Sequence, residues 1–293
     1  MTGYLHAFIS SLFFSIYVVP RKLSKLKPIE FSQLMAIGYF TSTVILYLFK
    51  PVLGFHETLS PALLLAVLGG AIWAASFVTF VKAIDILGLS RSNQWKNLQG
   101  PVAAIGGLIV LNEAQTTNPV FVLLAAVTIF ASAAALTIST SKQEAKTNLS
   151  GVYMAALAGL GFGTTAVIQK YVTTNVGVYS QQVVLSFSIM ASIALYLLIT
   201  RQKLPRIKPS DRQTRLGLLA GILYLGASFF QLQSYRFLPA SIAFTIIQLN
   251  AVWTIGIGIL YFKEIPFKEN RNRILLGLLL AVAGILLLGL ARK

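Results

Sequence analysis

The chain has 293 residues, of which 56% are hydrophobic and only 11% are charged, whereas roughly 25% of the residues in an ordinary soluble domain are charged. This composition argues against a soluble enzyme or binding domain, and the lack of cysteine excludes disulfide bridges and cysteine metal sites. The net charge of +16 would suggest nucleic-acid binding in a soluble chain. Here the cations lie in short loops between hydrophobic runs, so we assign them to orientation in a membrane and expect no nucleic-acid partner.

Hydrophobic runs of membrane-spanning length recur along the chain. The run from Val120 to Ile138 contains no charge, and the run from Ile274 to Ala291 contains no polar side chain. Since a bilayer core about 30 Å thick needs roughly 20 such residues in a helix, we predict an all-α polytopic membrane protein. The first run lacks a basic start and a cleavage site, so we expect a retained helix and no signal peptide. Ten transmembrane helices are expected, at residues 3–20, 31–49, 61–83, 88–111, 119–139, 150–172, 178–200, 215–236, 238–262 and 273–291.

Lys and Arg residues fall mainly into alternate connections. The connections after the first, third, fifth, seventh and ninth predicted helices are basic, and the longest of them, Arg201 to Arg215, is the most basic. Because the cytoplasmic loops of membrane proteins are the basic ones, we expect these odd-numbered loops in the cytoplasm and both termini outside the cell (inner) membrane. Ten helices suffice for a monomer, and a homodimer is the alternative.

The two halves of the chain, residues 1–141 and 150–293, resemble each other in sequence. Five helices per half is an odd number, so we expect two five-helix repeats of which the second is inverted. Inverted repeats are typical of secondary transporters, which bind substrate near the middle of the membrane at the interface between the repeats. The matches are Ala75-Ser76-Phe77 with Ala227-Ser228-Phe229, and Ser90, Asn97, Gly107 and Glu113 with Ser241, Gln248, Gly258 and Glu264.

Two stretches carry a resemblance to a known group of carriers. FFSIYVVPRK, from Phe13 to Lys22, has an aromatic and small-residue stretch that leads to a Val-Pro-x-Lys ending, and SRSNQWKNLQGPVAAIGGLIVLNE, from Ser90 to Glu113, is polar before it turns apolar. With ten helices and a five-plus-five repeat, the chain resembles the drug/metabolite transporter superfamily of EamA-like ten-helix carriers. The two stretches are similar to its glucose/ribose porter branch, and this resemblance implies a sugar as the substrate.

The fourth predicted helix is unusually polar in its first half. At 100° per residue, Asn93, Lys96 and Asn97 share one face with small residues, as expected of a helix that lines a cavity between closely packed neighbours. Trp95 and Gln99 lie on a different face, four residues apart. Trp95 is either an interfacial anchor or a ring against which substrate stacks. Rings and amides together suit a sugar, an amino acid or a nucleoside.

Pro101 and Lys96 determine how this helix could act. Pro101 has no N–H, so the carbonyl of Asn97 loses its usual helix partner and becomes a candidate acceptor for a polyol. We expect a kink at Gly100-Pro101. Two interpretations of Lys96 are open: its ammonium group binds the substrate, or the side chain snorkels to the headgroups from near the start of the helix.

Further stripes of polar and aromatic residues recur at helical spacing on other predicted helices. An uncharged stripe of this kind fits the wall of a cavity, and hydrogen bonding between helices is the alternative. The candidates for substrate binding in these stripes are Tyr17, Trp73, Tyr224, Gln231, Thr245 and Gln248.

Charged residues end four of the predicted helices in matching positions. Lys22 and Lys170 end the first helix of each half, where a cation is also favoured by the helix dipole alone. Glu113 and Glu264 end the fourth and ninth helices, where the dipole does not favour a carboxylate. We expect gating or structural ion pairs with the basic loops, and proton coupling through the carboxylates is the alternative.

No carboxylate falls in the central third of any predicted helix, and the sequence has no phosphate loop, metal cluster or catalytic triad. We therefore expect no enzyme, no cofactor and no metal. The sequence predicts a secondary transporter that moves a small neutral or zwitterionic hydrophilic metabolite, in the sharpest form a sugar, by alternating access. The alternatives are an exporter of amino acids or other metabolites, a membrane scaffold without transport activity and, with least support, a membrane-embedded enzyme.

Overall fold

The computed structural model describes residues 1–50, 57, 60–137, 148–263 and 267–291. Within these residues every regular element is a helix. Eight helices, some of them continuous across a short break, are long and apolar enough to cross a membrane, and the shorter apolar helices Gln99–Val110 and Pro119–Ser132 accompany them. The all-helical, polytopic architecture agrees with the sequence, and the count of ten spans stays a prediction.

Each predicted range contains helix in the described part of the chain, although several boundaries move by a few residues. The helices α4 and α8 end later than predicted, which places residues near their predicted ends deeper inside a helix. The elements are α1 (Thr2–Ile16), α2 (Val19–Leu23), α3 (Pro28–Leu48), α4 (Leu63–Leu87), α5 (Leu89–Lys96), α6 (Gln99–Val110), the 3-10 turn η1 (Glu113–Gln115), α7 (Pro119–Thr137), α8 (Leu149–Asn175), α9 (Val178–Ile199), α10 (Arg212–Tyr235), α11 (Ala240–Ile247), α12 (Asn250–Leu260) and α13 (Phe267–Ala291).

Three of the predicted helices are interrupted. The helix pairs α1–α2, α5–α6 and α11–α12 meet at residues 17–18, 97–98 and 248–249. Pro20 and Pro101 explain the first two breaks, because each removes an N–H group that the carbonyl four residues earlier would need. The kink expected at Gly100-Pro101 is therefore a break that lies earlier, at residues 97–98. In α8, Ile168 stands where the first repeat has Pro20, and the helix is continuous.

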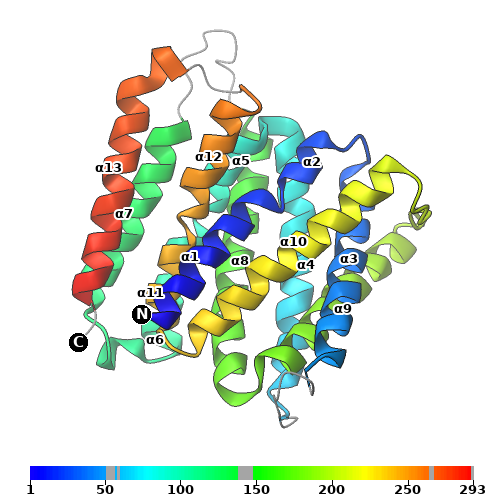
Figure 1. Ribbon diagram of the computed structural model, residues 1–293, viewed down its shortest axis with the longest axis horizontal. Coiled ribbons are helices and arrows are strands. Elements are labelled where there is room, and N and C mark those ends of the chain that lie inside the picture. The colour runs from blue at the N-terminus through cyan, green and yellow to red at the C-terminus, as the bar shows by residue number, and fades with distance from the viewer. Residues whose placement is uncertain (51–56, 58–59, 138–147, 264–266, 292–293) are drawn as a thin grey trace.

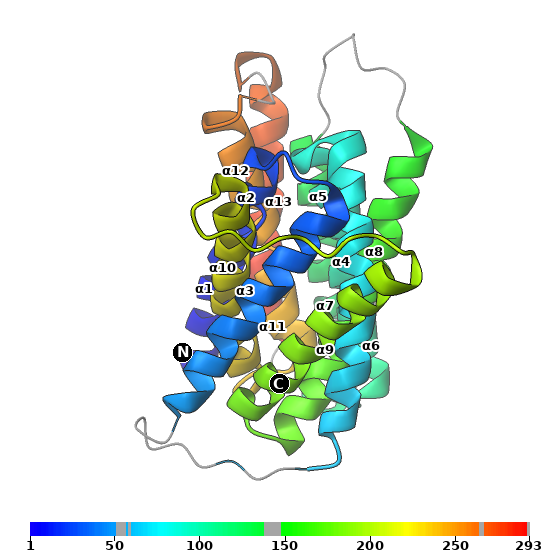
Figure 2. The same cartoon turned by 90° about the vertical axis from the view of Figure 1, so that its right-hand side faces the viewer.

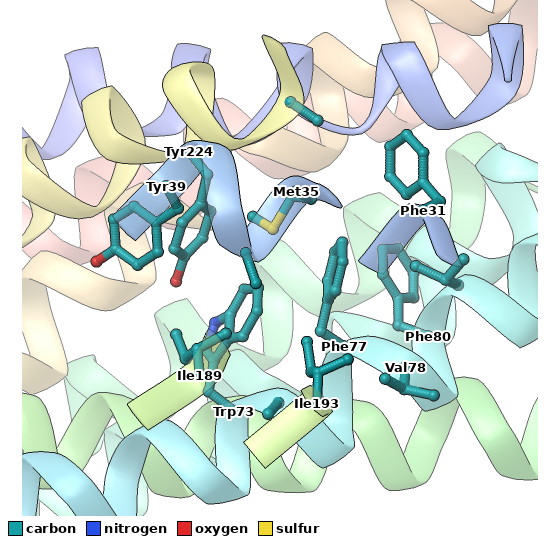
Figure 3. Packing of buried hydrophobic residues seen from close by; sticks show 14 of the residues in the cluster. Phe31, Met35, Tyr39, Trp73, Phe77, Val78, Phe80, Ile189, Ile193 and Tyr224 are labelled. Carbon is teal, nitrogen blue, oxygen red and sulfur yellow. The ribbon is translucent and has the colours of Figure 1, made fainter. Parts of the chain in front are cut away.

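The helices pack around two hydrophobic clusters. The first lies mainly among α3, α4, α9 and α10 and contains Trp73, Phe77 and Tyr224 (Figure 3). The second lies mainly among α6, α7, α11 and α13. Figure 1 shows α7 and α13 side by side at one edge of the molecule, and Figure 2 shows α9 beside α4 on the opposite side. The unbroken α8 packs against both α4 and α6, so it joins the two clusters.

Asp85, near the end of α4, forms an ion pair that its sequence neighbours do not indicate. A spacing of three residues predicts a pair with Lys82, and this prediction is wrong. Both carboxylate oxygens of Asp85 accept from Nη2 of Arg21, at 2.5 and 2.7 Å, and Nη1 of Arg21 donates to the carbonyl of Leu26 at 2.7 Å. Lys82 lies instead 5.9 Å from the ring centre of Tyr196. The pair ties the end of α4 to α2.

Replacing Asp85 by asparagine should lower the free energy of unfolding by about 1 kcal/mol. Charge-assisted hydrogen bonds to arginine are stronger than neutral ones, but Asp85 is 40% exposed, and solvent screens the charge. The matched control is Lys82→Ala, for which we expect a change near zero. Thermal unfolding in detergent measures both, and equal losses in the two variants would contradict the assignment of Arg21 as the partner.

Candidate functional site

An internal cavity lies where the two hydrophobic clusters meet, beside all three helix breaks, and only about 20 Å³ of it is open to the centre of a water molecule. Much of this space is narrower than a water molecule, so the cavity is constricted in this conformation. Its wall combines aromatic rings, amides and one ammonium group. The lining residues are Phe14, Tyr17, Trp73, Lys96, Gln99, Phe162, Thr165, Gln169, Tyr224, Gln231, Phe244 and Ile247.

One wall of the cavity is aromatic. The ring centres of Trp73 and Tyr224 are 4.6 Å apart, and Figure 3 shows the two rings directed toward each other. Tyr17 lies 5.2 Å from Tyr224, and Trp73 stacks on Phe77 at 4.8 Å. Behind Tyr224, the ring of Tyr39 meets it edge-on at 4.7 Å. The rings are therefore held in place by one another and offer flat apolar surface to a small ligand.

Another part of the wall carries a pair of amides. Nε2 of Gln231, in α10, donates to Oε1 of Gln169, in α8, at 3.0 Å and to the hydroxyl of Tyr235 at 2.8 Å. These bonds fix which way each amide points. Within the described residues, Oε1 of Gln231 and Nε2 of Gln169 have no hydrogen-bond partner. One acceptor and one donor are thus left for a ligand that brings hydroxyl groups.

Lys96 is the last residue of α5 and lines the same cavity. Its side chain is only 2% exposed, and Nζ lies 5.2 Å from the centre of the Phe80 ring, a cation–π contact. The side chain therefore points into the interior of the protein and does not reach its outer surface. Of the two interpretations of Lys96, the structure favours contact with whatever occupies the cavity.

Gln99 connects the cavity to a second, smaller void. Nε2 of Gln99, at the start of α6, donates to Oε1 of Gln248 at 2.8 Å, and Nε2 of Gln248 donates to the carbonyl of Asn97 at 3.2 Å. The carbonyl that Pro101 deprives of its helix partner is therefore bound by Gln248, and the expectation that it is free for a ligand is wrong. Asn97, Thr245 and Gln248 line a separate narrow void beside α7 that has no room for a water molecule.

Two further candidates, Asn93 and Trp95, line neither space. Asn93 is 1% exposed, and its Nδ2 atom has no partner in the described residues, whereas Trp95 is half-buried. The backbone of α5 packs closely on α8 here, because a Cβ atom on Gly159 would lie 2.6 Å from the carbonyl oxygen of Lys96. This close contact brings α5 against the helix that carries Gln169.

Glu113 and Lys170 hold the turn between α10 and α11 (residues 236–239). The carboxylate oxygens of Glu113 accept from the first two N–H groups of α11, at 2.5 and 2.9 Å, and the N-terminal end of a helix favours a negative charge. Nζ of Lys170 donates to the carbonyls of Tyr235 and Leu238, the latter at 2.9 Å. In the described part of the chain, the expected ion pair of Glu113 with a basic loop is thus replaced by backbone hydrogen bonds.

At the other end of the predicted repeat, the structure describes only one of the two charged residues. Nζ of Lys22 lies 6.0 Å from the centre of the Phe262 ring. Glu264 lies outside the described residues.

Three lining residues on α8, Phe162, Thr165 and Gln169, are absent from the sequence-based candidates. Their spacing of three and four residues places them on one face of a helix, which is a signal that the sequence contains. The predicted helix ends at residue 172 and so leaves Gln169 near its end, but α8 continues to Asn175. The cavity unites six of the candidates with them, namely Tyr17, Trp73, Lys96, Gln99, Tyr224 and Gln231.

Comparison with known proteins adds an independent observation. The family described as "Sugar transport protein" matches residues 35–291, which is most of the chain. The chain belongs to this family. A Listeria innocua protein named for sugar uptake, lin0215, is 22% identical to this family member over 263 residues, with 88% of each chain covered. A Bacillus cereus protein named for glucose uptake, GlcU, is 22% identical over 259 residues, with 87% of each chain covered.

A chain of known crystal structure has the same fold as this member of the sugar transport family. The two superimpose with a TM-score of 0.74 at 14% sequence identity, and the likeness covers 97% of this chain and 95% of the other. At that identity the likeness concerns the arrangement of the helices and carries no statement about substrate.

Proposed function

We propose that this protein is a secondary carrier that moves a sugar across a cell membrane by alternating access, and that the cavity, constricted in the present conformation, is its binding site. The observation that carries the proposal is the composition of the wall. Trp73 and Tyr224 lie 4.6 Å apart, beside the unpaired amide atoms of Gln169 and Gln231. Aromatic rings pack against the apolar face of a sugar, while amides both donate to and accept from its hydroxyl groups.

The relatives and the placement of Lys96 support a sugar carrier over the alternatives. Two relatives are named for sugar or glucose uptake, which favours import of a sugar over export of an amino acid. A scaffold without transport activity would leave Lys96 and Gln248 against lipid or packed apolar side chains. Lys96 lines the cavity, and Gln248 is bonded to Gln99 beside it.

Alternating access would follow from two inverted repeats, residues 1–141 and 150–293, that rock around the cavity. The breaks at residues 97–98 and 248–249 stand at the offset at which the two halves match in sequence. The stretch from Gly161 to Lys170, GFGTTAVIQK, can be aligned with FFSIYVVPRK from Phe13 to Lys22. In this alignment Phe14 is equivalent to Phe162 and Tyr17 to Thr165, and all four residues line the cavity. Broken helices at a repeat interface are a common way to place binding groups near the middle of a membrane. These features support the drug/metabolite transporter superfamily as the wider group.

The charged residues at the helix ends supply candidate gates. The distribution of Lys and Arg over the loops supports an outer position for the turn at residues 236–239, which Glu113 and Lys170 hold. By the predicted repeat, Lys22 is the cytoplasmic counterpart of Lys170, and Glu264, which lies outside the described residues, is the counterpart of Glu113. Opening then requires one set of contacts to release while the other is kept.

Replacing Gln231 by alanine should raise the KM for the transported sugar about fivefold. The change removes one acceptor for the ligand and frees Gln169 from its bond, and a hydrogen bond of this kind contributes about 1 kcal/mol. The control is Leu219→Ala, on the same helix but 45% exposed on its outer face, for which we expect an unchanged KM. Uptake of radiolabelled D-glucose or D-ribose into proteoliposomes measures both.

The same proteoliposomes, tested with a panel of sugars, amino acids and nucleosides, decide the function. Saturable uptake of at least one sugar, with a KM that depends on Gln231, is the expected result. Saturable flux of amino acids alone would favour the exporter. The absence of flux for every compound in the panel, from a protein that unfolds cooperatively, would overturn the carrier.

A further inference from the structure

Lys96 brings an unmatched positive charge to the cavity. Among the described residues that line it, Lys96 alone carries a formal charge. Its side chain is 2% exposed, and no carboxylate in the described parts of the chain lies within 4 Å of Nζ. A buried ammonium group without an anionic partner is costly, since it has lost its hydration and gained no counter-charge. Such a group needs an anionic partner, and the described residues do not supply one within 4 Å.

Two features beside Lys96 offset part of the cost of burying its charge. Lys96 is the last residue of α5, where the free carbonyl end of a helix carries partial negative charge. The face of the Phe80 ring, 5.2 Å away, stabilises a cation further. Neither a helix end nor a ring is a full negative charge. The site is therefore arranged for an ammonium group that is completed by an anion from outside.

We propose that the sugar bound in this cavity carries one carboxylate, as an aldonate or uronate does, and that Lys96 is the residue that binds it. The inference deepens the proposed function and rests on it, because it concerns the substrate of the same cavity. One ammonium balances one carboxylate, whereas the two charges of a sugar phosphate would leave a negative charge unpaired in the same buried space. The stoichiometry of charge therefore favours the carboxylate.

The rest of the wall is suited to the uncharged part of such a molecule. Lys96 and Gln99 flank the α5–α6 break, whereas Gln169 and Gln231 stand on α8 and α10. A ligand whose carboxylate lies at Lys96 would place its hydroxyl groups against the free amide atoms of that pair. The rings around Trp73 would then cover its apolar face. Each class of group on a sugar acid thus has a counterpart in the wall.

Uptake by the full-length protein in proteoliposomes tests the inference, with D-glucose, D-gluconate, D-glucuronate and D-glucose 6-phosphate as the probes. For the unaltered protein we expect kcat/KM for gluconate or glucuronate to exceed that for glucose by about tenfold or more, as a charge-assisted hydrogen bond in a buried site implies. Lys96→Gln should lower kcat/KM for gluconate and glucuronate about tenfold more than it lowers kcat/KM for glucose, so that the preference for a carboxylate is lost. Lys96→Arg, which keeps the charge, should retain most of it.

The possible outcomes separate this inference from the function on which it rests. Saturable uptake of glucose with no preference for a carboxylate leaves the sugar carrier intact and overturns the inference. The inference is also wrong if glucose 6-phosphate is preferred, or if Lys96→Gln lowers kcat/KM for glucose and for glucuronate by the same factor. No uptake of any sugar defeats the proposed function itself. If Lys96→Gln does not fold, two measurements on the unaltered protein still test the inference. One is its preference in uptake for a carboxylate, and the other is whether glucuronate raises its unfolding temperature more than glucose does.

Discussion

Replacing Gly221 by alanine is expected to destabilise the protein strongly, although the change adds only one methyl group. A Cβ atom on Gly221 would lie 2.2 Å from the carbonyl oxygen of Met35 and 2.3 Å from the backbone nitrogen of Tyr39. A Cβ atom on Gly38 would lie 2.4 Å from the carbonyl oxygen of Leu218. The helices α3 and α10 thus cross with backbone against backbone, and backbone atoms cannot swing aside as the end of a side chain can.

The crossing of α3 and α10 also sets the aromatic wall of the cavity. It places the ring of Tyr39 edge-on to Tyr224 at 4.7 Å, and the hydroxyl of Tyr39 donates to the amide oxygen of Gln182 and lies 3.1 Å from the hydroxyl of Ser228. Separating the two helices to admit a methyl group would pull Tyr39 away from these partners. We therefore expect Gly221→Ala to affect both stability and transport.

For Gly221→Ala we expect a loss of about 3 kcal/mol in the free energy of unfolding, at the upper end of the range for overpacked interiors, and a clear fall in sugar uptake. The matched control is Gly256→Ala in α12, where an added Cβ atom meets nothing within 4 Å. There alanine should stabilise the protein by about 0.4–1 kcal/mol, because it restricts the unfolded chain. Thermal unfolding in detergent and uptake into proteoliposomes measure the pair. Similar losses of stability and uptake in the two variants would show that the close contact between the α3 and α10 backbones is not the cause of the effect.

Sequence patterns predict the existence of the helices well but only one of their three breaks, the one near Pro101; Pro20 is the signal for a second break, within a helix predicted to be continuous over residues 3–20. The apolar runs determine where helices can form, because few other structures satisfy the backbone in a bilayer. Pro20 and Pro101 indicate interruptions of α1–α2 and α5–α6. The break at residues 248–249 has no such signal, since it contains neither proline nor glycine. There the N–H groups of Gln248 and Leu249 donate to the carbonyls three residues earlier, those of Thr245 and Ile246. Tertiary packing decides it.

The same breaks limit how much of the cavity could be predicted. Helical spacing assigns Asn97 to the face of Lys96, but the helix ends between residues 96 and 99, so a count of 100° per residue does not continue across it. Lys96 and Gln99 line the cavity from the two sides of the break, while Asn97 faces a separate void. Gln169, on the unbroken α8, follows a regular spacing, so the sequence pattern does indicate its position.

Glu113 and Lys170 bind opposite ends of the same short turn, so their contributions to stability should be coupled. Glu113, 7% exposed, accepts from two N–H groups at the start of α11, and Lys170 donates to the carbonyls of Tyr235 and Leu238 at the end of α10. Their opposite charges also attract each other. If either side chain is lost, the turn can move, and the hydrogen bonds of the other side chain lose part of their favourable geometry. A turn held from both sides is what a closed gate at this end of the protein would need.

We expect Glu113→Ala to lower the free energy of unfolding by about 3 kcal/mol, because two buried N–H groups lose a charged acceptor. Lys170→Met keeps the aliphatic stem and should cost about 1–2 kcal/mol. The double variant should lose less than the sum of the two, by about 1 kcal/mol, since both act on residues 236–239. The control is Thr174→Ala, on the neighbouring exposed face of α8. The hydroxyl of Thr174 forms hydrogen bonds only within its own helix, to the carbonyl of Tyr171 and the side chain of Asn175. We expect this variant to change the free energy of unfolding little. Thermal unfolding of these variants and of the unaltered protein gives the double-mutant cycle for Glu113 and Lys170, with Thr174→Ala as the control. Strict additivity would mean that Glu113 and Lys170 stabilise separate structures, and that the turn they share is no gate.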